Sequence, residues 1–487
     1  MFTLPLDILL IFTAVSPVIG WATPKLYRSK IAGAFSAIAL SVTGIALYSL
    51  YQDVSANGAI YVTGNSLIAG HLKVDMLSVF MASIFLVLGL AATIYSMEYV
   101  ENSARSPIYY TLILTMISGM IGIVFSGDLF TLYVFWELMS VSTYVLVAFF
   151  REQWESVEAS LKYLIMGAAG SAAALFGISI VYGLAGTLSF EGLAAAFTAT
   201  TSPWLYVAAI FIFVGFGVKA AFVPLHTWLP DAHSSAPSTI SALLSGIVIG
   251  TGVFVIARTL FSVFASIQQQ WLPIIAVLSF ITMFLGNITA LLQTDLKRML
   301  AYSSIAQVGY MLVGLAVGTQ TGLTGTFLQF FNHALMKGLA FLCAGAIIYR
   351  LGTKELKDMI GVGRKMPITA IAFSISLFAL IGMPPFNGFI SELTLFTSTF
   401  QVNLAWLGVA LIVNSVISAA YYLRVVRNIM QIPVSEKVEK VKEVPLLMLI
   451  PICVLAVSII VFGIWPDPLV NFANQAAKAL VCFGGLI

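Results

Sequence analysis

Residues 131–150, TLYVFWELMSVSTYVLVAFF, form a nearly continuous apolar run with a single carboxylate, Glu137, close to its middle. A run of about 20 apolar residues is long enough to cross the hydrocarbon core of a bilayer as a helix. A charged group near the centre of such a helix costs roughly 2.5 to 3.5 kcal/mol on insertion scales. The position of Glu137 therefore requires a partner, internal water or a functional role.

The whole chain shares the composition of this run. Of its 487 residues, 60% are hydrophobic and only 9% are charged, and the mean hydropathy is +1.02, which excludes a soluble domain of this size. The short alternating segments of a membrane β-barrel are not seen in the sequence. We therefore predict an all-α polytopic membrane protein with about 14 transmembrane helices. The apolar runs lie at 4–22, 30–52, 74–96, 108–126, 128–150, 159–185, 203–231, 238–260, 271–293, 299–318, 325–349, 367–401, 404–428 and 445–465.

The distribution of basic residues predicts the orientation. Loops after the odd-numbered runs hold seventeen Lys and Arg residues, whereas the opposite loops and tail hold three, Lys73, Arg258 and Lys478. Basic loops face the cytoplasm, so we expect a multi-pass protein of the cell (inner) membrane with both termini outside. The first run has no basic stretch before it and thirteen runs follow it, so we do not expect a cleaved signal peptide.

The sequence shows no redox or nucleotide site of its own. Cys343, Cys453 and Cys482 lack the spacing of iron–sulfur or zinc ligands, and the sequence has no P-loop. We expect no cofactor or metal in this chain, and no nucleic-acid partner.

Two segments in the middle of the chain resemble each other. SLKYLIMGAAG (160–170) aligns with LMKGLAFLCAG (335–345), and the next predicted helix in each case carries proline, at Pro224 and at Pro384–Pro385. Proline frees a backbone carbonyl inside the helix. Numbering the predicted helices in the order of their apolar runs, we predict that helices 7 (203–231) and 12 (367–401) are broken. Helices 4–8 and 9–13 would form two five-helix repeats of opposite orientation, a plan typical of transporters. Chance similarity of two Ala- and Gly-rich helices is the alternative.

These boundaries divide the chain into four parts. Helices 1–3 occupy 1–107, the first repeat 108–260, the second repeat 261–430, and a cytoplasmic loop, helix 14 and the tail 431–487.

Four ionisable residues lie well inside predicted spans: Glu137, Lys219, Lys337 and Glu392. Tyr133, Ser140 and Tyr144 share the helical face of Glu137, His333 lies one turn before Lys337, and Ser303, Gln307 and Tyr310 share one face of helix 10. Titratable groups of alternating sign through the bilayer centre are typical of a proton relay. Structural ion pairs that lock helices together are the alternative.

Other polar residues give weaker signals. His226 and His233, near the cytoplasmic end of helix 7, are candidate proton-entry residues or simply solvated histidines. Asp128 is placed to cap helix 5. The charged run SEKVEKVKE (435–443) indicates a solvated cytoplasmic loop, with docking of a partner as the alternative.

Six ordered motifs then resemble a known family. They are SGDLFTLYVFWELMSVSTYVLVAF, EASLKYLIMGAAGSA, VKAAFVPLHTWLPDAHSSAPSTISALLSG, DLKRMLAYSSIAQVGYM, NHALMKGLAFLCAGAI and GMPPFNGFISELTLF. Together they resemble the antiporter-like subunits of respiratory complex I, Mrp-type cation/proton antiporters and energy-converting hydrogenases. The likeness covers nearly the whole chain.

The resemblance implies roles for particular residues. Glu137 matches the helix 5 glutamate that pairs with the helix 7 lysine, here Lys219. Lys337 matches the central lysine of helix 11, and Glu392 matches the exit-side residue of helix 12. Lys162 matches a lysine at the start of helix 6 and is a secondary candidate. Several members have a lysine in helix 8, where this chain has Gly250, and others a histidine, where it has Ser245, so the central relay must rest on Lys337 and water.

The resemblance also implies a function and partners. We expect a proton-translocating subunit, of the inner N or M type, in a complex that oxidises NADH or a reduced deazaflavin coenzyme with a quinone-type acceptor. Other membrane subunits, the surrounding lipid and peripheral redox subunits with iron–sulfur clusters and flavin would be its partners. The alternatives are an Mrp-type sodium/proton antiporter subunit, a hydrogenase subunit, or a scaffold that moves no ions.

Overall fold

The computed structural model describes residues 5–24, 27–63, 71–100, 105–198, 202–431 and 436–481. The α-helices are α1 (Pro5–Ala22), α2 (Arg28–Asn57), α3 (Met76–Tyr99), α4 (Ser106–Phe125), α5 (Leu129–Val147), α6 (Trp154–Ala185), α7 (Phe190–Phe197), α8 (Pro203–Ala220), α9 (Trp228–Ser235), α10 (Ser238–Leu243), α11 (Ile249–Ser262), α12 (Gln268–Leu291), α13 (Leu296–Val317), α14 (Gln320–Leu351), α15 (Pro367–Ile381), α16 (Asn387–Thr399), α17 (Ala405–Met430), α18 (Glu436–Glu439), α19 (Leu446–Ile464) and α20 (Asp467–Val481). A π-helical turn, η1 (Leu244–Val248), joins α10 to α11, and short 3₁₀ turns are η2 (Ala265–Ile267), η3 (Leu356–Met359), η4 (Val362–Arg364) and η5 (Phe400–Val402).

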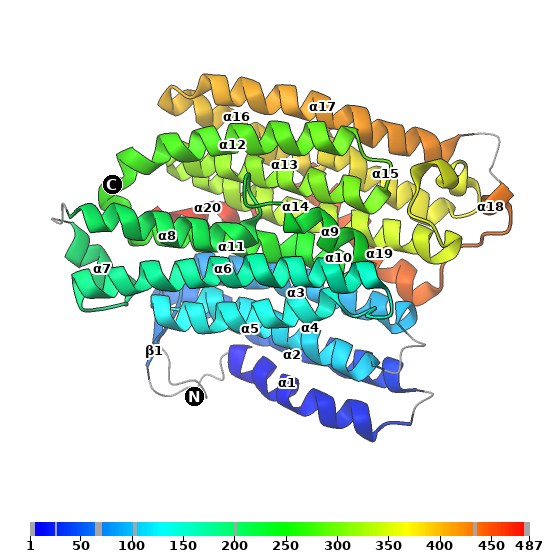
Figure 1. The fold of residues 1–487 in the computed structure, drawn as a ribbon, viewed down its shortest axis with the longest axis horizontal. Helices are drawn as coiled ribbons and strands as arrows, with labels where there is room; N and C mark the ends of the chain where they lie inside the picture. The colour runs from blue at the N-terminus through cyan, green and yellow to red at the C-terminus, as the bar shows by residue number, and fades with distance from the viewer. Residues whose placement is uncertain are drawn as a thin grey trace.

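The long helices lie side by side with their axes roughly parallel (Figure 1). Thirteen of the described helices are long and apolar enough to cross a membrane, or up to fourteen if a bent pair is counted as one span. The predicted all-α polytopic fold is confirmed. One small exception is an antiparallel hairpin of β1 (Ile60–Thr63) and β2 (His71–Val74), which the hydropathy pattern did not predict.

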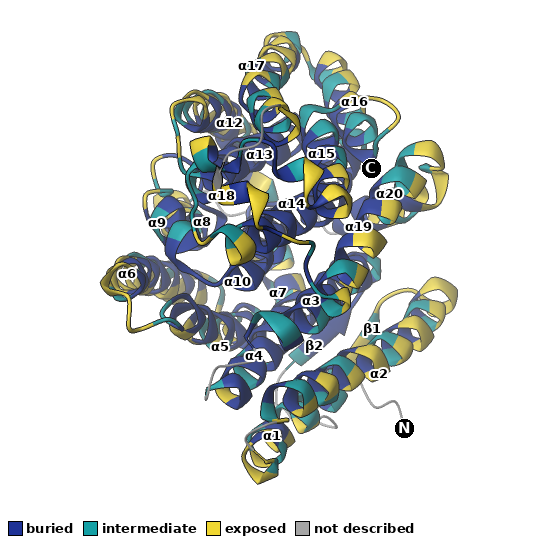
Figure 2. Ribbon diagram, turned by 90° about the vertical axis from the view of Figure 1, so that its right-hand side faces the viewer, coloured by how far each residue is buried: buried dark blue, intermediate teal, exposed yellow. Residues whose placement is uncertain are grey.

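Burial follows the expectation for a bundle in lipid. Figure 2, which looks along the helix axes, shows buried residues around α10 and α14 and exposed residues on the outer sides of α2, α6, α12 and α17. The exposed side chains are themselves apolar: Ile45 of α2 is 71% exposed and Val416 of α17 is 68% exposed. Because apolar side chains are stable against lipid tails, this outer surface is suited to a bilayer. The helix at the centre of the fold is α14.

The predicted helix 7 (203–231) corresponds to α8 and α9, and the predicted helix 12 (367–401) corresponds to α15 and α16. Both are interrupted near their prolines. The first break follows α8, where Ala221 takes a left-handed conformation, and α9 resumes the direction after Pro224. The second follows α15 at Gly382, and α16 begins after Pro384 and Pro385. Broken helices leave backbone groups free inside the bundle, where protein or water satisfies them.

One local arrangement occurs twice, at opposite ends of the bundle. Asp128 caps α5 and forms an isolated bridge with Ser189 just after α6, and Asp295 caps α13 and forms the same bridge with Glu355 just after α14. Both α6 and α14 have 32 residues and end at a left-handed glycine. Five membrane crossings separate the two arrangements, so this recurrence supports the predicted inverted repeat. The capping role predicted for Asp128 is confirmed.

The two ends of the bundle have different chemistry. At the hairpin end, defined by β1, β2 and α7, Arg258 makes two hydrogen bonds to Asp75, with N–O distances of 2.6 and 2.9 Å, and Lys73 pairs with Glu191 at 3.0 Å. Tyr61 also donates to Glu191, and this hydrogen bond lowers the pKa of the Glu191 carboxyl. These contacts fasten the loops that close this end.

The opposite end is defined by α18 and η3. There, part of the loop predicted to be solvated (435–443) is bound to the bundle by hydrogen bonds and an ion pair. Lys437 pairs with Asp358 at 2.9 Å, and the Glu443 carboxylate accepts hydrogen bonds from the backbone N–H of Ile368 (3.1 Å) and from the hydroxyl of Thr369 (2.6 Å). A carboxylate at a helix N-terminus satisfies free N–H groups and is favoured by the helix dipole. The solvated-loop prediction is therefore wrong for Glu443, which caps the first half of helix 12.

Candidate functional site

Lys219 is buried in the last turn of α8 among hydroxyl and aromatic groups. Its ammonium donates to the Tyr163 hydroxyl at 2.8 Å and lies 3.4 Å from the Thr143 hydroxyl. The Nζ atom also sits 4.4 and 4.6 Å from the ring centroids of Tyr163 and Tyr144. Trp228 of α9 stacks on Tyr163 at 3.9 Å, so the second half of the broken helix fixes the phenol that holds the lysine.

Glu137 lies close to this cluster without forming an ion pair with Lys219. One carboxylate oxygen, Oε1, is buried and has no hydrogen-bond partner among the described residues. The carboxylate still interacts electrostatically with Lys219 and with Tyr133 and Tyr144 of its own helix. The sequence resemblance implied a Glu137–Lys219 pair; the structure gives Lys219 hydroxyl partners instead, and leaves a buried acceptor available for water or a proton.

Lys337 is fully buried near the middle of α14. Its ammonium donates to the Leu300 carbonyl at 3.0 Å and to the Ser303 hydroxyl, and lies 3.3 Å from the Tyr422 hydroxyl. In the described part of the chain no carboxylate forms a salt bridge with Lys337; its partners are neutral oxygens. The alternative of a structural ion pair therefore has no support at this lysine.

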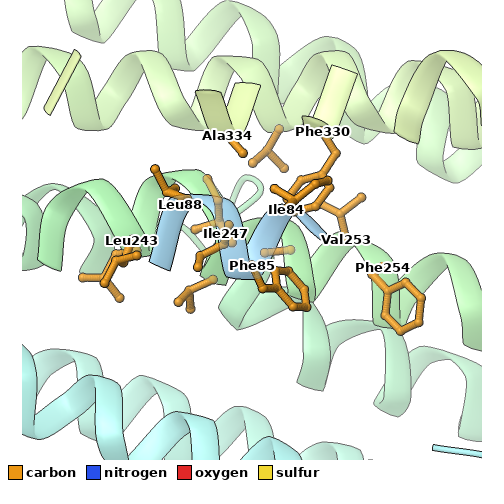
Figure 3. Packing of buried hydrophobic residues seen from close by; sticks show 14 of the residues in the cluster. Ile84, Phe85, Leu88, Leu243, Ile247, Val253, Phe254, Phe330 and Ala334 are labelled. Carbon is orange, nitrogen blue, oxygen red and sulfur yellow. The ribbon is translucent and has the colours of Figure 1, made fainter. Parts of the chain in front are cut away.

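The predicted helix 8 (238–260) is formed by α10, η1 and α11 and is not the element labelled α8. It passes between the two lysine clusters and presents apolar residues there, which form an apolar seam. A Cβ atom at Gly250 would lie 1.5 Å from the Phe330 ring of α14, and one at Gly252 would lie 2.6 Å from the backbone of Ala220 in α8. Figure 3 shows Leu88 of α3, Phe330 and Ala334 of α14 and Ile247 of helix 8 in one apolar cluster. A lysine at position 250 would have no room, because Phe330 occupies that space.

A polar link runs beside this seam at the π-helical turn. The Ser245 and Ser304 hydroxyls are 2.7 Å apart, and His333 Nε2 lies 3.1 Å from the Ser245 carbonyl. A π-turn shifts the backbone hydrogen-bonding pattern and is common at functional sites. His333 thus stands one helical turn from Lys337 on the side facing helix 8.

The two histidines predicted at the end of helix 7 differ in environment. His226 lies in the break and is partly exposed, and its Nδ1 atom is buried without a hydrogen-bond partner among the described residues. His233 is fully buried, stacks on Phe341 at 4.9 Å, and neither ring nitrogen has a partner in the described chain. The partial exposure of His226 is compatible with a proton-entry or solvated histidine. The prediction of a solvated side chain is wrong for His233, because α9 turns it inward.

Glu392 is 8% exposed and lies against the break in helix 12. Its Oε2 atom accepts a hydrogen bond from the Ser415 hydroxyl at 2.8 Å. A cavity of about 460 Å³ opens beside it, lined by Met383, Phe389, Phe396, Leu411, Ile412 and Ser415 among others. The carboxylate is thus placed between the bundle interior and an apolar groove on the outer surface.

Gly382 makes room for this carboxylate. Its φ is +82°, a conformation that L-residues rarely adopt, and an added Cβ would lie 2.4 Å from Glu392 Oε2. Gly352 at the end of α14 has a similar φ of +71°, but an added Cβ would meet nothing within 4 Å. Both glycines therefore need a positive φ, but only at Gly382 would an added Cβ collide with a neighbouring side chain.

If the chain translocates protons, as the sequence resemblance implies, we expect Gly382→Ala to reduce that transport at least tenfold, because the new methyl group displaces the Glu392 carboxylate. Gly352→Ala is the matched control: both substitutions carry about 1 to 2 kcal/mol of left-handed strain, and only the first touches Glu392. Transport rates in vesicles and assembly by gel filtration measure the difference. Equal losses in the two variants would show that strain, not displacement, is responsible.

Lys162 lies apart from the buried cluster, at the end opposite the hairpin. Its side chain is 50% exposed and pairs with Glu158 at 2.8 Å and with Asp231 of α9 at 3.0 Å. Arg298 of α13 binds the other oxygen of Asp231 at 3.2 Å. Lys162 is therefore part of a surface network that holds α9 between the two predicted repeats, and the structure does not bring it to Lys219.

Sequence reasoning missed several residues that hold the buried charges. Tyr163, Thr143, Ser415 and Tyr422 were not singled out, although Ser415 and Tyr422 are spaced seven apart on α17, as Ser303 and Tyr310 are on α13. The same polar periodicity search, applied to helix 13, would have found two of them. In the described ranges no group of three or more His, Cys, Asp or Glu residues is placed to hold a metal ion.

Comparisons with known proteins agree on the kind of chain. Residues 126–418 match the family described as NADH:quinone oxidoreductase/Mrp antiporter, TM. The chain is 36% identical over 457 residues to F(420)H(2) dehydrogenase subunit N of Methanosarcina mazei, covering 90% of this chain and 91% of that one. It is 35% identical over 409 residues to NADH-quinone oxidoreductase subunit N of Desulforudis audaxviator, covering 80% and 81% of the two chains.

A solved structure gives the same picture. A chain of the membrane-bound sulfane sulfur reductase, an archaeal respiratory membrane complex, superposes with a TM-score of 0.88 at 28% identity, covering 98% of this chain and 97% of that chain.

Proposed function

The chain belongs to the NADH:quinone oxidoreductase/Mrp antiporter family of membrane subunits, and we propose that it is the proton-translocating, antiporter-like subunit of a redox-driven membrane complex. The observation that carries this proposal is the set of ionisable groups inside the bundle: the buried Lys219, Lys337 and Glu392, and the half-buried Glu137. Three of them, Lys219, Lys337 and Glu392, are at most 8% exposed. Each of these three contacts a hydroxyl group, and among the described residues none of them forms a salt bridge. Buried groups that are not locked in ion pairs are free to change protonation state.

The environment of each group suggests a role. Glu137 and Lys219 interact electrostatically, so a change in the charge of one alters the proton affinity of the other. Lys337 at the centre accepts and releases a proton among neutral oxygens, and Glu392 at the helix 12 break passes it on. Lys162 lies near the end opposite the hairpin and is a secondary candidate for proton entry. The partly exposed His226 lies deeper, in the break between α8 and α9, and is a second candidate. His233, which is buried and close enough to Lys337 and His333 to interact electrostatically, would act inside the pathway.

The redox chemistry would take place in other subunits. The relatives at 36% and 35% identity are named as subunits of dehydrogenases that oxidise F(420)H(2) or NADH. We therefore propose a reduced deazaflavin or nicotinamide donor and peripheral subunits that carry flavin and iron–sulfur clusters. Neighbouring membrane subunits and lipid would cover the apolar outer surface. The asymmetry of basic residues supports a cell-membrane location with both termini outside.

The test is to reconstitute the purified complex in vesicles. Orientation is first established with single cysteines at positions 440 and 478, in a chain lacking its native cysteines: an impermeant thiol reagent should reach only 440 when the cytoplasmic side faces outward. In such vesicles, oxidation of the donor by a quinone should acidify the lumen without sodium. Proton movement that follows an imposed sodium gradient and ignores donor oxidation would instead identify an Mrp-type exchanger.

A further inference from the structure

Two helices facing each other in the second half of the bundle carry matching hydroxyl groups. Ser303 and Tyr310 are seven residues apart on α13, and Ser415 and Tyr422 are seven apart on α17. Seven residues are two turns, or roughly 10 Å along a helix axis. The helices run in opposite directions, so Ser303 shares a level with Tyr422 and Tyr310 shares a level with Ser415.

Each level touches one of the buried ionisable groups. Lys337 contacts the Ser303 and Tyr422 hydroxyls at the first level. At the second level, the Tyr310 and Ser415 hydroxyls are 3.3 Å apart, and Ser415 donates to Glu392 at 2.8 Å. The tyrosines are at most 1% exposed and lie close enough to interact electrostatically.

An amide pair fixes the relative height of the helices. Asn287 of α12 donates to the Asn414 side chain of α17 at 2.9 Å, and Tyr421 donates to the Asn287 side-chain oxygen at 2.8 Å. All three are buried. Because both amides bond to specific partners, α17 is held in the register that places Ser415 opposite Tyr310.

We propose that Tyr422, Tyr310 and Ser415 carry the proton from Lys337 to Glu392. This path runs about two helical turns along the membrane normal towards the hairpin end, and it rests on the proposed proton-translocating function. The Lys337 ammonium gives a proton to the Tyr422 oxygen as the Tyr422 hydroxyl proton moves on, by way of water, to Tyr310. Tyr310 passes its own proton to Ser415, and Ser415 passes its own to Glu392. The end state is a neutral lysine amine and a protonated Glu392, and every hydroxyl remains neutral.

The chemistry requires hydroxyls that both donate and accept. Ser415 meets this requirement, because its hydroxyl is closer to Glu392 (2.8 Å) than to the Leu411 carbonyl (3.3 Å). Ser303 does not, because its hydroxyl donates to the Leu300 carbonyl at 2.8 Å. Ser418, one turn from Ser415 on the same helix, donates only to the Ser415 backbone carbonyl, at 2.8 Å. Ser418 is therefore a matched control for Ser415: the same substitution on the same helix, away from Glu392.

The experiment compares Tyr422→Phe, Ser415→Ala and Ser418→Ala in the reconstituted complex. We expect Tyr422→Phe and Ser415→Ala to slow donor-driven proton transport by about 100-fold, the scale of a lost proton-transfer group, and to raise its solvent deuterium isotope effect. Assembly and electron transfer to a soluble acceptor should stay at wild-type levels. Ser418→Ala should match the wild type in all these measurements.

Three outcomes would overturn the inference. Wild-type transport in Tyr422→Phe or Ser415→Ala, with Lys337→Met inactive, would remove the hydroxyl path and leave the proposed function standing. An equal loss in Ser418→Ala, or a loss with an unchanged isotope effect, would show a packing defect instead of a lost proton carrier. Wild-type transport in Lys337→Met itself would overturn the proposed function, and the path with it.

Discussion

Replacement of Lys337 by either methionine or arginine is expected to abolish donor-driven proton transport while the complex still assembles. Methionine removes the titratable group, and arginine keeps the charge but does not release its proton at accessible pH. The structure explains why methionine should be tolerated in folding: the partners of Lys337 are the Leu300 carbonyl, Ser303 and Tyr422, so no buried carboxylate loses a counter-charge.

Proton transport in vesicles and assembly on native gels measure this prediction. Lys357→Met is the control, because Lys357 is an exposed cation in η3 whose loss should leave transport unchanged. An active Lys337→Arg complex would refute the carrier role, since a permanently charged side chain would then suffice.

Glu137→Gln is expected to have an effect of similar size. Glutamine keeps the shape of the side chain and removes its charge, and the electrostatic interaction with Lys219 disappears with it. Proton transport should fall below a tenth of the wild-type rate, because Lys219 no longer senses a change of charge at position 137. Electron transfer from the donor to a soluble acceptor should continue, since the redox centres are proposed to lie in other subunits.

The matched control for Glu137→Gln is Glu152→Gln. The Glu152 side chain is 66% exposed and pairs with Arg105 on the surface, so the same chemical change there should leave transport intact. Protons taken up per donor oxidised is the decisive quantity. An unchanged ratio in Glu137→Gln would remove Glu137 from the pathway.

The helices were predictable because their signal is local. Long apolar runs specify membrane helices by length alone, and the breaks near Pro224 and Pro384 follow from the missing backbone N–H of proline. The hairpin of β1 and β2 was missed because its strands have only four residues each and pair through backbone groups that leave no hydropathy pattern.

The site was only partly predictable, because its geometry depends on contacts between distant residues. A charge inside an apolar run marks Glu137 or Lys337 directly. That Tyr163 holds Lys219, or that Ser415 holds Glu392, depends on residues 56 and 23 positions away in the chain. Phe330 of α14 fills the space beside Gly250 of α11 because the two helices pack against each other. The spacing of residues within either helix does not reveal this contact.

The apolar seam formed by α10, η1 and α11 has a consequence for the proposed pump when no electrons flow. Phe330, Leu88 and Ile247 line this seam, and none of their side chains offers water a hydrogen-bond partner. Hydrophobic constrictions in channels close by dewetting and open when water enters. Under the proposed function, this seam would act as a gate against leak: an idle complex would hold the membrane voltage, and each catalytic cycle would have to wet the gate before charge crosses from one half to the other.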